Sequence, residues 1–228
     1  MKTLAIIPAR GGSEGIPRKN VRLLAGKPLI AHTIGAAAQA SSVNRVVVST
    51  DDDEIARISR QWGAEVVSRP AGISTYNASS ELALLHTLEY LDKTEQYNPD
   101  LVVFLQCTSP LTLPEDIDGT VQALFDQEAD SSLAVTPFHY FLWRRDINGD
   151  AIGVNHDKRV RLLRQERDSQ YLETGAVYVM RTKGFKEARH RFFGKTAMYV
   201  MPSERCLEID EPVHFTIAEV LLSERQQG

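Results

Sequence analysis

The chain has 228 residues, a net charge of −4 at pH 7, and is 43% hydrophobic and 25% charged. These values are typical of one globular domain with a single core, and they exclude collagen-like, coiled-coil and disordered chains. The slightly acidic balance argues against a protein whose main task is to neutralise nucleic-acid phosphates, so no nucleic-acid partner is expected. The longest apolar runs, such as Leu101–Leu105, are far shorter than the roughly 20 residues that cross a bilayer, so no membrane partner is expected.

Two further features concern the cellular compartment. No apolar segment with a small-residue cleavage site follows Met1, so we expect a cytoplasmic protein. The two cysteines, Cys107 and Cys206, are too few for a disulfide framework or a thiolate metal site, and we expect both to be reduced. We interpret Cys107 as a small packed residue, since no histidine pattern supports a nucleophile.

Short β-branched runs alternate with helical patterns along the first two thirds of the chain. This order is typical of parallel strands covered by helices. Acids after Asp51 mark one helix start, and Thr112-Leu113-Pro114-Glu115 resembles a capping box with an early proline. The predicted strands are Thr3–Ile7, Arg45–Ser49, Ala64–Val67, Asp100–Gln106 and Ser131–Thr136, and the predicted helices are Pro28–Ala40, Asp52–Trp62, Ser79–Asp92 and Glu115–Gln127.

The alternation stops after Thr136, where residues 137–170 are rich in arginine, aspartate and aromatic residues and lack a long helical period. The pair Asn148-Gly149 predicts a two-residue hairpin turn, and Val154–Val160 offers a second hairpin. We therefore expect an excursion from the sheet inside one domain that spans residues 1–228. After it, the patterns predict strands at Gly175–Met180 and Thr196–Met201 and a helix at Pro212–Glu224.

The loop Pro8–Asn20 follows the first predicted strand, at the end of a parallel strand where ligands bind, and its glycines would let backbone N–H groups approach phosphates. The dinucleotide fingerprint fails because Arg10 stands where it needs glycine, and the P-loop fails because Pro28 follows Gly26-Lys27. What remains is a glycine loop with Arg10, Arg18 and Lys19. Such a loop suits a triphosphate, although a surface turn with solvated basic residues fits it equally well.

The run Ile7-Pro-Ala-Arg-Gly-Gly-Ser-x-Gly-Ile-Pro-Arg-Lys-Asn20 resembles the signature of the acylneuraminate cytidylyltransferases, which make CMP-activated sialic acids and related nine-carbon sugars. The resemblance continues along essentially the whole chain. It implies a Rossmann-like nucleotidyltransferase fold, a mostly parallel central sheet flanked by helices, and a homodimer in which a protruding β-rich excursion reaches the neighbouring active site. The further matches are Val48-Ser49-Thr50-Asp51, Arg69-Pro70, Ala78-Ser79-Ser80, Leu105-Gln106-x-Thr108-Ser109-Pro110-Leu111, Gly175-Ala176-Val177-Tyr178, Phe192-Phe193 and Ile209-Asp210.

The resemblance also implies site residues and a reaction. CTP and a nine-carbon 2-keto sugar acid would give the CMP-sugar and pyrophosphate, with Mg²⁺ as cofactor. Arg10, Lys19 and Asp210 would be catalytic, because cations near the transferred phosphoryl group stabilise its developing charge. The implied nucleotide-binding residues are Ala9, Arg10, Gly11, Gly12, Asn20, Arg69, Ala78 and Ser80, and the implied sugar-binding residues are Gln106, Arg164, Thr174, Tyr178, Phe192 and Phe193.

The predicted metal ligands are Glu208 and Asp210. Their spacing puts both carboxylates on one face of an extended segment, and Mg²⁺ typically takes one or two carboxylates plus phosphate oxygens. Two acids so spaced are more often just solvated, and only the resemblance favours a metal. Local alternatives also exist for other residues: Arg69-Pro70 and Ser79-Ser80 suit turn and cap roles, and strand aromatics are more often core.

Three positions depart from the family pattern. Glu14 stands where the family usually has lysine, Glu208 replaces an aspartate, and Thr174 stands where many members have asparagine. No residue is assigned as general base. Two alternatives stay open: a cytidylyltransferase for the eight-carbon sugar acid of lipopolysaccharide, which usually has an aspartate in the motif that reads Gln106-Cys107-Thr108 here, and a non-catalytic nucleotide-binding protein, favoured by Glu14.

Overall fold

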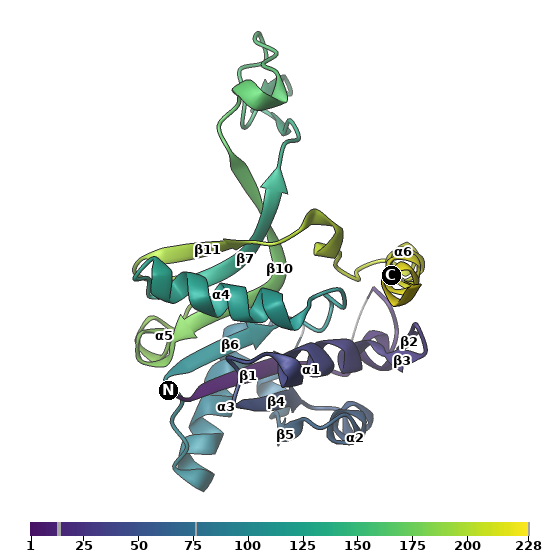
Figure 1. The fold of residues 1–228 in the computed structure, drawn as a ribbon, viewed down its shortest axis with the longest axis vertical. Coiled ribbons are helices and arrows are strands. Elements are labelled where there is room, and N and C mark those ends of the chain that lie inside the picture. Colours follow the sequence, from purple (N-terminus) through teal and green to yellow (C-terminus); the bar gives the residue numbers. More distant parts are fainter. Residues whose placement is uncertain (13–14, 76, 228) are drawn as a thin grey trace.

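The computed structural model describes residues 1–12, 15–75 and 77–227. These residues form a central seven-stranded sheet with the strand order β11-β7-β10-β6-β1-β4-β5 (Figure 1). All strands of this sheet run parallel except β10, which is antiparallel to both β6 and β7. The strands are β1 (Thr3–Pro8), β4 (Arg45–Thr50), β5 (Glu65–Ser68), β6 (Leu101–Leu105), β7 (Ser131–Phe138), β10 (Gln170–Arg181) and β11 (Thr196–Val200).

Helices cover both faces of the sheet, which confirms the predicted fold class. The predicted helices and strands are all present, with ends that differ by a few residues. A hairpin also forms around Asn148-Gly149 as predicted, whereas α5 and the other short strands were not predicted. Among the described residues, no helix is long and apolar enough to span a membrane. The helices are α1 (Leu29–Gln39), α2 (Asp53–Gln61), α3 (Ser80–Glu95), α4 (Pro114–Asp126), α5 (Thr182–Ala188) and α6 (Pro212–Gln227).

The strands alternate their side chains between two buried layers. On one face Ala5 and Ile7 of β1 pack with residues of α1, α2 and α4. On the other face Leu4 and Ile6 pack with residues of α3 and α5. Both faces are therefore covered, and for this reason the strands read as continuous apolar runs in the sequence.

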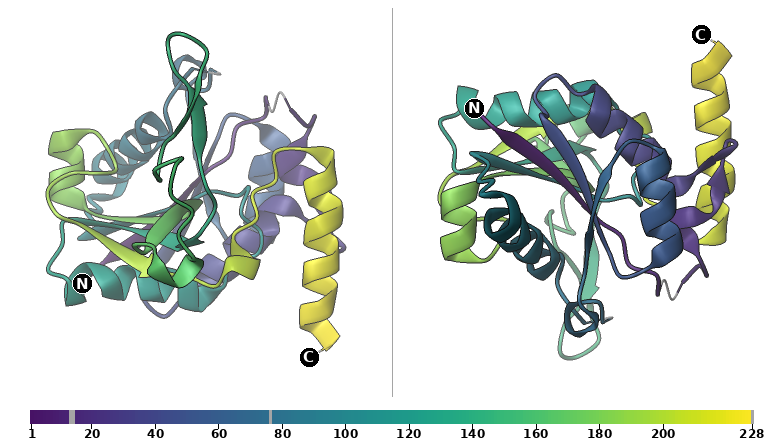
Figure 2. Two further views of the ribbon diagram at one scale, coloured as in Figure 1. Left: turned by 90° about the horizontal axis from the view of Figure 1, so that it is seen from above. Right: turned by 90° about the horizontal axis from the view of Figure 1, so that it is seen from below.

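A third apolar cluster lies at the edge of the molecule, where α6 packs beside the short strands β2 (Leu23–Leu24) and β3 (Lys27–Pro28) (Figure 2). Ile16, from the loop after β1, and Ile209, from the segment before α6, are both buried in it. This cluster therefore packs the loop after β1 against the segment before α6.

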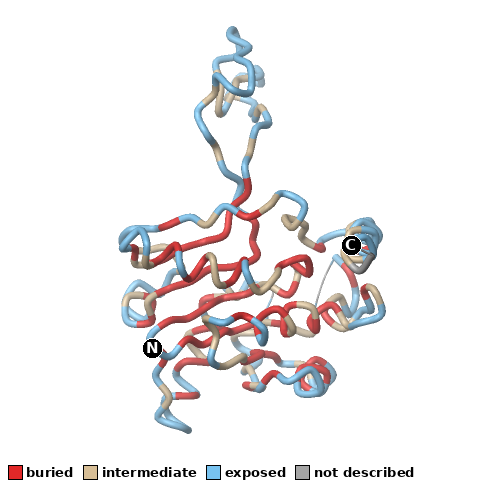
Figure 3. The backbone as a smooth tube through the Cα atoms, in the orientation of Figure 1, coloured by how far each residue is buried: buried red, intermediate tan, exposed pale blue. Residues whose placement is uncertain are grey.

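The excursion leaves the body of the molecule between β7 and β10, which extend beyond the sheet as a two-stranded stalk (Figure 1). Most of its residues are exposed, in contrast to the buried sheet below (Figure 3). It holds the small hairpin of β8 (Trp143–Arg145) and β9 (Ala151–Gly153). The excursion was predicted, but its detail was not.

The predicted two-residue turn at Asn148-Gly149 is wrong. Arg145 pairs with Ala151, so residues 146–150 form the connection. The side chain of Asp146 accepts hydrogen bonds from the backbone N–H groups of Asn148 and Asp150, at 2.8 and 2.9 Å, and this longer loop replaces the tight turn. The second hairpin suggested for Val154–Val160 is also absent, since these described residues form bends and turns.

The helix starts follow the predicted chemistry in part. Asp52 caps α2 by accepting a hydrogen bond from the backbone N–H of Ile55 at 2.9 Å. At α4 the acceptor is Asp116, which binds the backbone N–H of Leu113 at 2.9 Å. Thr112 does not cap the helix, because its hydroxyl donates to the carbonyl of Ser109.

Two helical glycines provide a matched test of the packing. A Cβ at Gly119 in α4 would lie only 2.6 Å from Cζ of Tyr199 in β11, whereas one at Gly35 in α1 would lie 4.0 Å from its nearest neighbour. We expect Gly119→Ala to lower the free energy of unfolding by about 1–3 kcal/mol, because the ring must shift. Gly35→Ala should raise it by about 0.4–1 kcal/mol. Thermal and urea unfolding measure both values, and equal stabilisation by the two variants would contradict the packing of α4 against β11.

Candidate functional site

Three segments far apart in the sequence meet at the carboxyl ends of β1 and β6. They are the loop after β1, the loop after β6 and the segment before α6. The carboxyl edge of a parallel sheet is where ligands bind. The loop after β1 is joined to β4 by the bond from the N–H of Ala9 to the carbonyl of Ser49, at 2.9 Å. After β6, the carbonyl of Thr108 accepts a hydrogen bond from the N–H of Ile209 at 2.7 Å. Gln106 donates its backbone N–H to Ala176 of β10 at 3.3 Å. Most of the predicted site residues are in or beside these segments.

Lys19 reaches from the first of these segments to the last. Its Nζ donates to the carbonyl oxygen of Ile209 at 2.8 Å and lies 3.3 Å from Oδ1 of Asp210. The side chain is 16% exposed, so the ammonium is largely enclosed yet reachable from the site. Arg18 instead turns to α2, where Asp52, at 2.6 Å, and Glu54 pair with its guanidinium. Lys19 therefore faces the segment before α6, while Arg18 is bound at the start of α2.

Asn20 fixes the shape of the loop. Its Nδ2 donates to the carbonyl of Arg10 at 3.0 Å, and its Oδ1 accepts a hydrogen bond from Sγ of Cys107 at 3.1 Å. The buried amide therefore ties the loop after β1 to the segment after β6. Its predicted contact with the nucleotide stays a prediction, since the side chain is already bonded at both ends.

The glycines of the loop allow close approach to α2. The N–H of Gly11 donates to Oδ1 of Asp51 at 3.1 Å, and a Cβ at Gly11 would lie 2.7 Å from Oδ2 of Asp52. Gly12 has open space around it. Glu14, the predicted departure in charge, lies outside the described residues.

Arg69 lies at the end of β5 beside the loop. Its Nη2 is 3.4 Å from Oδ1 of Asp51, and its side chain is buried. Among the described residues its Nε has no hydrogen-bond partner. Burial lowers the pKa of Arg69, and the charge of nearby Arg10 lowers it further, against the pull of Asp51. The carboxylate of Asp51 is the anion that pairs with Arg69 in this structure.

Ala78 and Ser80 lie where α3 begins. Ser80 is the first residue of the helix and Ser79 precedes it as the cap residue. The N–H of Ala78 donates to the carbonyl of Thr75 at 3.1 Å. Backbone donors at such a helix start suit either a cap or a ligand, so the structure is compatible with both interpretations.

Glu208 and Asp210 differ in environment. Asp210 has a 65% exposed side chain, whereas Glu208 packs against Gly175, where a Cβ would lie 2.7 Å from Cδ of Glu208. Gly175 has φ +67°, so this position favours glycine on both counts. Burial raises the pKa of Glu208, Asp210 and Glu173 raise it further, and Lys19 opposes them. The charge of Asp210 therefore acts on Glu208, although the two side chains differ in exposure.

The aromatic residues of the predicted sugar site lie against the sheet. Tyr178 is buried and stacks on Phe104, with ring centroids 5.3 Å apart, and the edge of Phe192 meets it at 5.9 Å. Phe193 packs on α5, where a Cβ at Gly184 would lie 2.9 Å from Cζ of its ring. Thr174 is also buried and donates its hydroxyl to the carbonyl of Ala134 at 2.9 Å. These side chains are built into the core at the border of the site.

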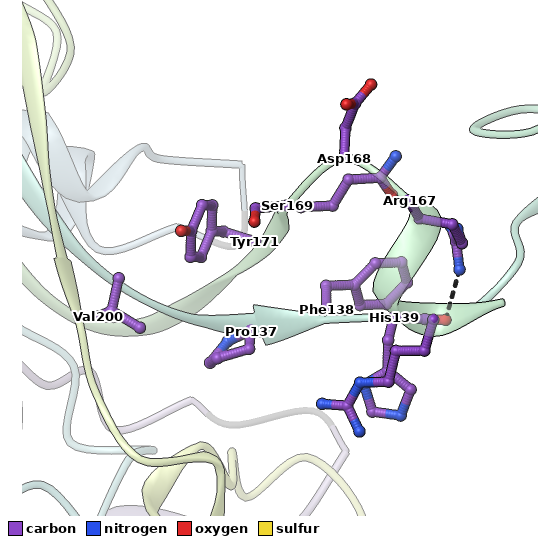
Figure 4. Close-up of a pocket in the computed structure, with 10 residues that line it drawn as sticks. Pro137, Phe138, His139, Arg167, Asp168, Ser169, Tyr171 and Val200 are labelled. Carbon is purple, nitrogen blue, oxygen red and sulfur yellow. Dashed lines mark hydrogen bonds between the residues drawn. The ribbon is translucent and has the colours of Figure 1, made fainter.

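Arg164 is not brought to the other predicted residues within one chain. It belongs to the short helix η3 (Arg164–Glu166) and lines a cavity of about 280 Å³ at the base of the excursion (Figure 4). The floor of this cavity is fixed by Arg167, whose Nη1 donates to the carbonyl of His139 at 2.7 Å. Within the described residues, no hydrogen bond or ring contact joins Arg164 to Gln106 or Tyr178.

Sequence reasoning missed a polar network beside the site. Arg191 pairs with Glu81 at 2.7 Å, and the hydroxyl of Tyr178 donates to Glu173. Arg191 and Glu173 flank the matched pairs Phe192-Phe193 and Gly175-Ala176. Their closeness to those motifs was the available signal.

Cys107 provides a test of the site's interior. It is buried, and burial raises the pKa of its thiol to about 11. At pH 8 about one thiol in 1,000 is then ionised, and the thiolate is the reactive form. We expect iodoacetamide to leave Cys107 unmodified in the native protein and to label the half-buried Cys206 first, with both labelled in urea, as measured by peptide mass spectrometry. Labelling of Cys107 as fast as Cys206 would contradict its place behind the loop.

Comparison with known proteins agrees with this arrangement. Residues 4–211 match the family model described as cytidylyltransferase. The chain is 34% identical over 235 residues to the CMP-N,N'-diacetyllegionaminic acid synthase of Legionella pneumophila, covering 100% of this chain and 99% of that one. It is 35% identical over 222 residues to N-acylneuraminate cytidylyltransferase B of Danio rerio, covering 94% of this chain but about half of that relative's length.

A solved structure extends the comparison to the fold. The CMP:2-keto-3-deoxy-manno-octonic acid synthetase complexed with CTP superposes with a TM-score of 0.72, covering 99% of this chain and 100% of that one at 19% identity. At this identity the likeness concerns the fold alone. From the match over residues 4–211 and the relatives above 30% identity, the chain belongs to the cytidylyltransferase family.

Proposed function

We propose that this chain transfers CMP from CTP to the anomeric hydroxyl of a nine-carbon 2-keto sugar acid and releases pyrophosphate. The observation that carries the proposal is the contact of Lys19 with Ile209 and Asp210, which sets the phosphate-binding loop against an acidic pair at the carboxyl edge of the sheet. Relatives that match nearly the whole chain are named for legionaminic and pseudaminic acids. A nine-carbon substrate is therefore favoured over an eight-carbon one.

The residues present fit a bound Mg²⁺. Glu208 and Asp210 supply hard carboxylate oxygens. Burial raises the pKa of Glu208 and the charge of Asp210 raises it further, and a nearby cation would favour the ionised form of Glu208. No group of three metal-ligating side chains occurs among residues 1–12, 15–75 and 77–227. An Mg²⁺ ion held by this pair would complete its shell with phosphate oxygens and water. When bound, Mg²⁺ would neutralise charge on the triphosphate. Asp210, the more exposed of the two acids, would be the principal ligand.

The cations of the loop act on the transferred phosphoryl group. The anomeric hydroxyl loses its proton to solvent water as its oxygen bonds to the α-phosphorus. The bond from that phosphorus to the bridging oxygen breaks, and the electron pair leaves with pyrophosphate. Lys19 and Arg10 stabilise the charge that develops on these oxygens. Lys19 is already oriented by two acceptors, so little reorganisation accompanies the reaction.

The nucleotide would lie across the loop and the start of α3. Ala9, Gly11 and Gly12 offer backbone groups, and Arg69 offers a buried guanidinium that nearby Arg10 biases toward an anion. Ala78 and Ser80 at the start of α3 would hold the base and ribose. Support for CTP comes from the structural neighbour, which was solved with that nucleotide.

The excursion supports a homodimer. Trp143, Ile147, Leu162 and Leu163 are all exposed on it, and exposed apolar groups concentrated in this way mark an interaction surface. In such a dimer Arg164 of one protomer would serve the site of its partner and bind the sugar carboxylate, which explains why a single chain leaves it apart. We infer one catalytic domain over residues 1–228 that acts in the cytoplasm, where CTP is made and where the free thiols Cys107 and Cys206 stay reduced.

The proposal predicts pyrophosphate release that depends on both Mg²⁺ and a nine-carbon 2-keto acid. The assay supplies CTP with sialic, deaminated sialic, legionaminic, pseudaminic and eight-carbon acids in turn. A preference for one of the nine-carbon acids is expected. Highest turnover with the eight-carbon acid would support the alternative substrate, and CTP binding without turnover on any acid would make the chain a nucleotide-binding protein.

The acidic pair predicts a graded loss of metal dependence. Asp210→Asn removes the charge but not the size of the principal ligand, so turnover should fall on the order of 100-fold or more and the Mg²⁺ midpoint should rise. Glu208→Gln should have the smaller effect on both. Mg²⁺ titration of turnover measures this, and thermal unfolding checks the fold. Wild-type activity and midpoint in Asp210→Asn would show that the pair is structural.

A further inference from the structure

A network of side chains that the proposed reaction does not use borders the site at β10. The guanidinium of Arg191 lies over the rings of Phe104 and Tyr178, 4.8 and 4.7 Å from their centroids. Its Nε donates to Oε1 of Glu81 at 2.7 Å, and both side chains of this pair are largely buried. A largely buried arginine held by a carboxylate and by two aromatic rings is restricted in its motion.

This network fixes Tyr178. Its ring is stacked on Phe104, covered by Arg191 and met at its edge by Phe192. A buried phenol needs a hydrogen-bond partner. The hydroxyl donates to Oε1 of Glu173, so the direction of this bond is set by the packing of the ring.

Glu173 is the exposed end of the network. The pairing of β10 with β7 shifts register between Glu173 and Tyr178, and Gly175 within this irregular stretch has φ +67°. Such a bulge changes the direction in which side chains point, and here it lets two residues five positions apart meet. A carboxylate offers about four acceptor positions, and Tyr178 occupies one of them. The remaining positions of an exposed but immobilised carboxylate are available to a ligand.

The same stretch of β10 joins Glu173 to the candidate site. Gly175 packs against Glu208, and the carbonyl of Ala176 accepts the backbone N–H of Gln106. The carboxylate of Glu173 therefore borders the space between the acidic pair and the predicted sugar-binding residues.

We propose that Glu173 binds the sugar acid directly, by accepting a hydrogen bond from a hydroxyl or acylamino N–H group, and thereby selects among sugar acids. This inference rests on the proposed function. The carboxylate of the substrate would be repelled by Glu173 and Glu208, so the donor-bearing part of the sugar faces Glu173. A sugar acid that lacks the donor would leave a desolvated carboxylate unpaired, and a site of this kind rejects such analogues strongly.

The test compares steady-state kinetics of the wild type with Glu173→Ala, Glu173→Gln and Tyr178→Phe, using the sugar acid that gives the highest wild-type turnover. Glu173→Ala should lower kcat/KM for the sugar acid on the order of 10- to 100-fold, the loss of a hydrogen bond to a charged group, with the KM for CTP unchanged. Glu173→Gln keeps an acceptor oxygen and should recover part of the loss. Tyr178→Phe frees the carboxylate and should show a smaller loss in the same direction. Glu187→Ala, on the exposed face of α5, is the matched control and should equal the wild type.

A second readout separates binding from a merely structural role. The ratio of kcat/KM between the best sugar acid and the others of the panel should fall in Glu173→Ala, because the lost acceptor favoured one of them. Unchanged sugar kinetics and ratios, or a shift in the Mg²⁺ midpoint alone, would overturn the inference while the proposed function stands. Absence of wild-type turnover on every acid would overturn both. If Glu173→Ala unfolds below the assay temperature, Glu173→Gln alone decides between these outcomes.

Discussion

The site depends on one contact that closes the chain on itself. Nζ of Lys19 donates to the carbonyl of Ile209, 190 residues away, and lies beside Asp210. A largely enclosed ammonium must find acceptors, and here the segment before α6 supplies them. The side chain of Ile209 is buried with Ile16 and Phe215 in the cluster under α6, so the same residue is held from its apolar side. The segment before α6 has no regular secondary structure. The ammonium of Lys19 and the buried side chain of Ile209 together hold this segment at the edge of the sheet.

The sheet decides where this contact can form. The parallel strands β1 and β6 end side by side, so their following loops share one edge. The antiparallel β10 lies on the other side of β6 and passes this edge within its length, at the irregular stretch around Gly175. A regular strand would have continued its alternation there, whereas the bulge brings Glu173, Tyr178 and Glu208 to one place. The antiparallel strand β10 therefore forms one side of the candidate site.

Much of the fold could be predicted because both faces of the sheet are buried. Runs such as Leu101–Leu105 must then be apolar throughout, and they stand out from the helices around them. Helix α5 directly follows β10 and has only seven residues, and seven residues are too few for a helical period to show in the sequence. The loop at 146–150 was missed because the bonds of the Asp146 side chain outweigh the preference of Asn-Gly for a tight turn.

The candidate site was predictable in part, for a different reason. Lys19 and Asp210 were found through a family motif, but no local pattern could show that they touch, because 190 residues separate them. Arg164 was predicted for the sugar, and its place on the excursion can be reconciled with that role only through a second protomer. Thr174 was predicted from its motif position, yet its hydroxyl is bonded within the sheet. Glu173 stands two residues before the matched Gly175-Ala176, but its bond with Tyr178 forms through the bulge, which no sequence pattern shows.

The acidic side of the site carries an electrostatic cost in the fold. The pKa of Glu208 is raised in the folded chain by burial, Asp210 and Glu173. A carboxyl whose folded pKa exceeds its unfolded pKa destabilises the fold fully above the folded value, and this cost disappears below the unfolded value. Lys19 opposes that rise, so the ammonium that joins the loop after β1 to the segment before α6 also reduces this cost. A cation held by Glu208 and Asp210, as proposed above, would reduce the cost further, because it would favour the ionised form of Glu208.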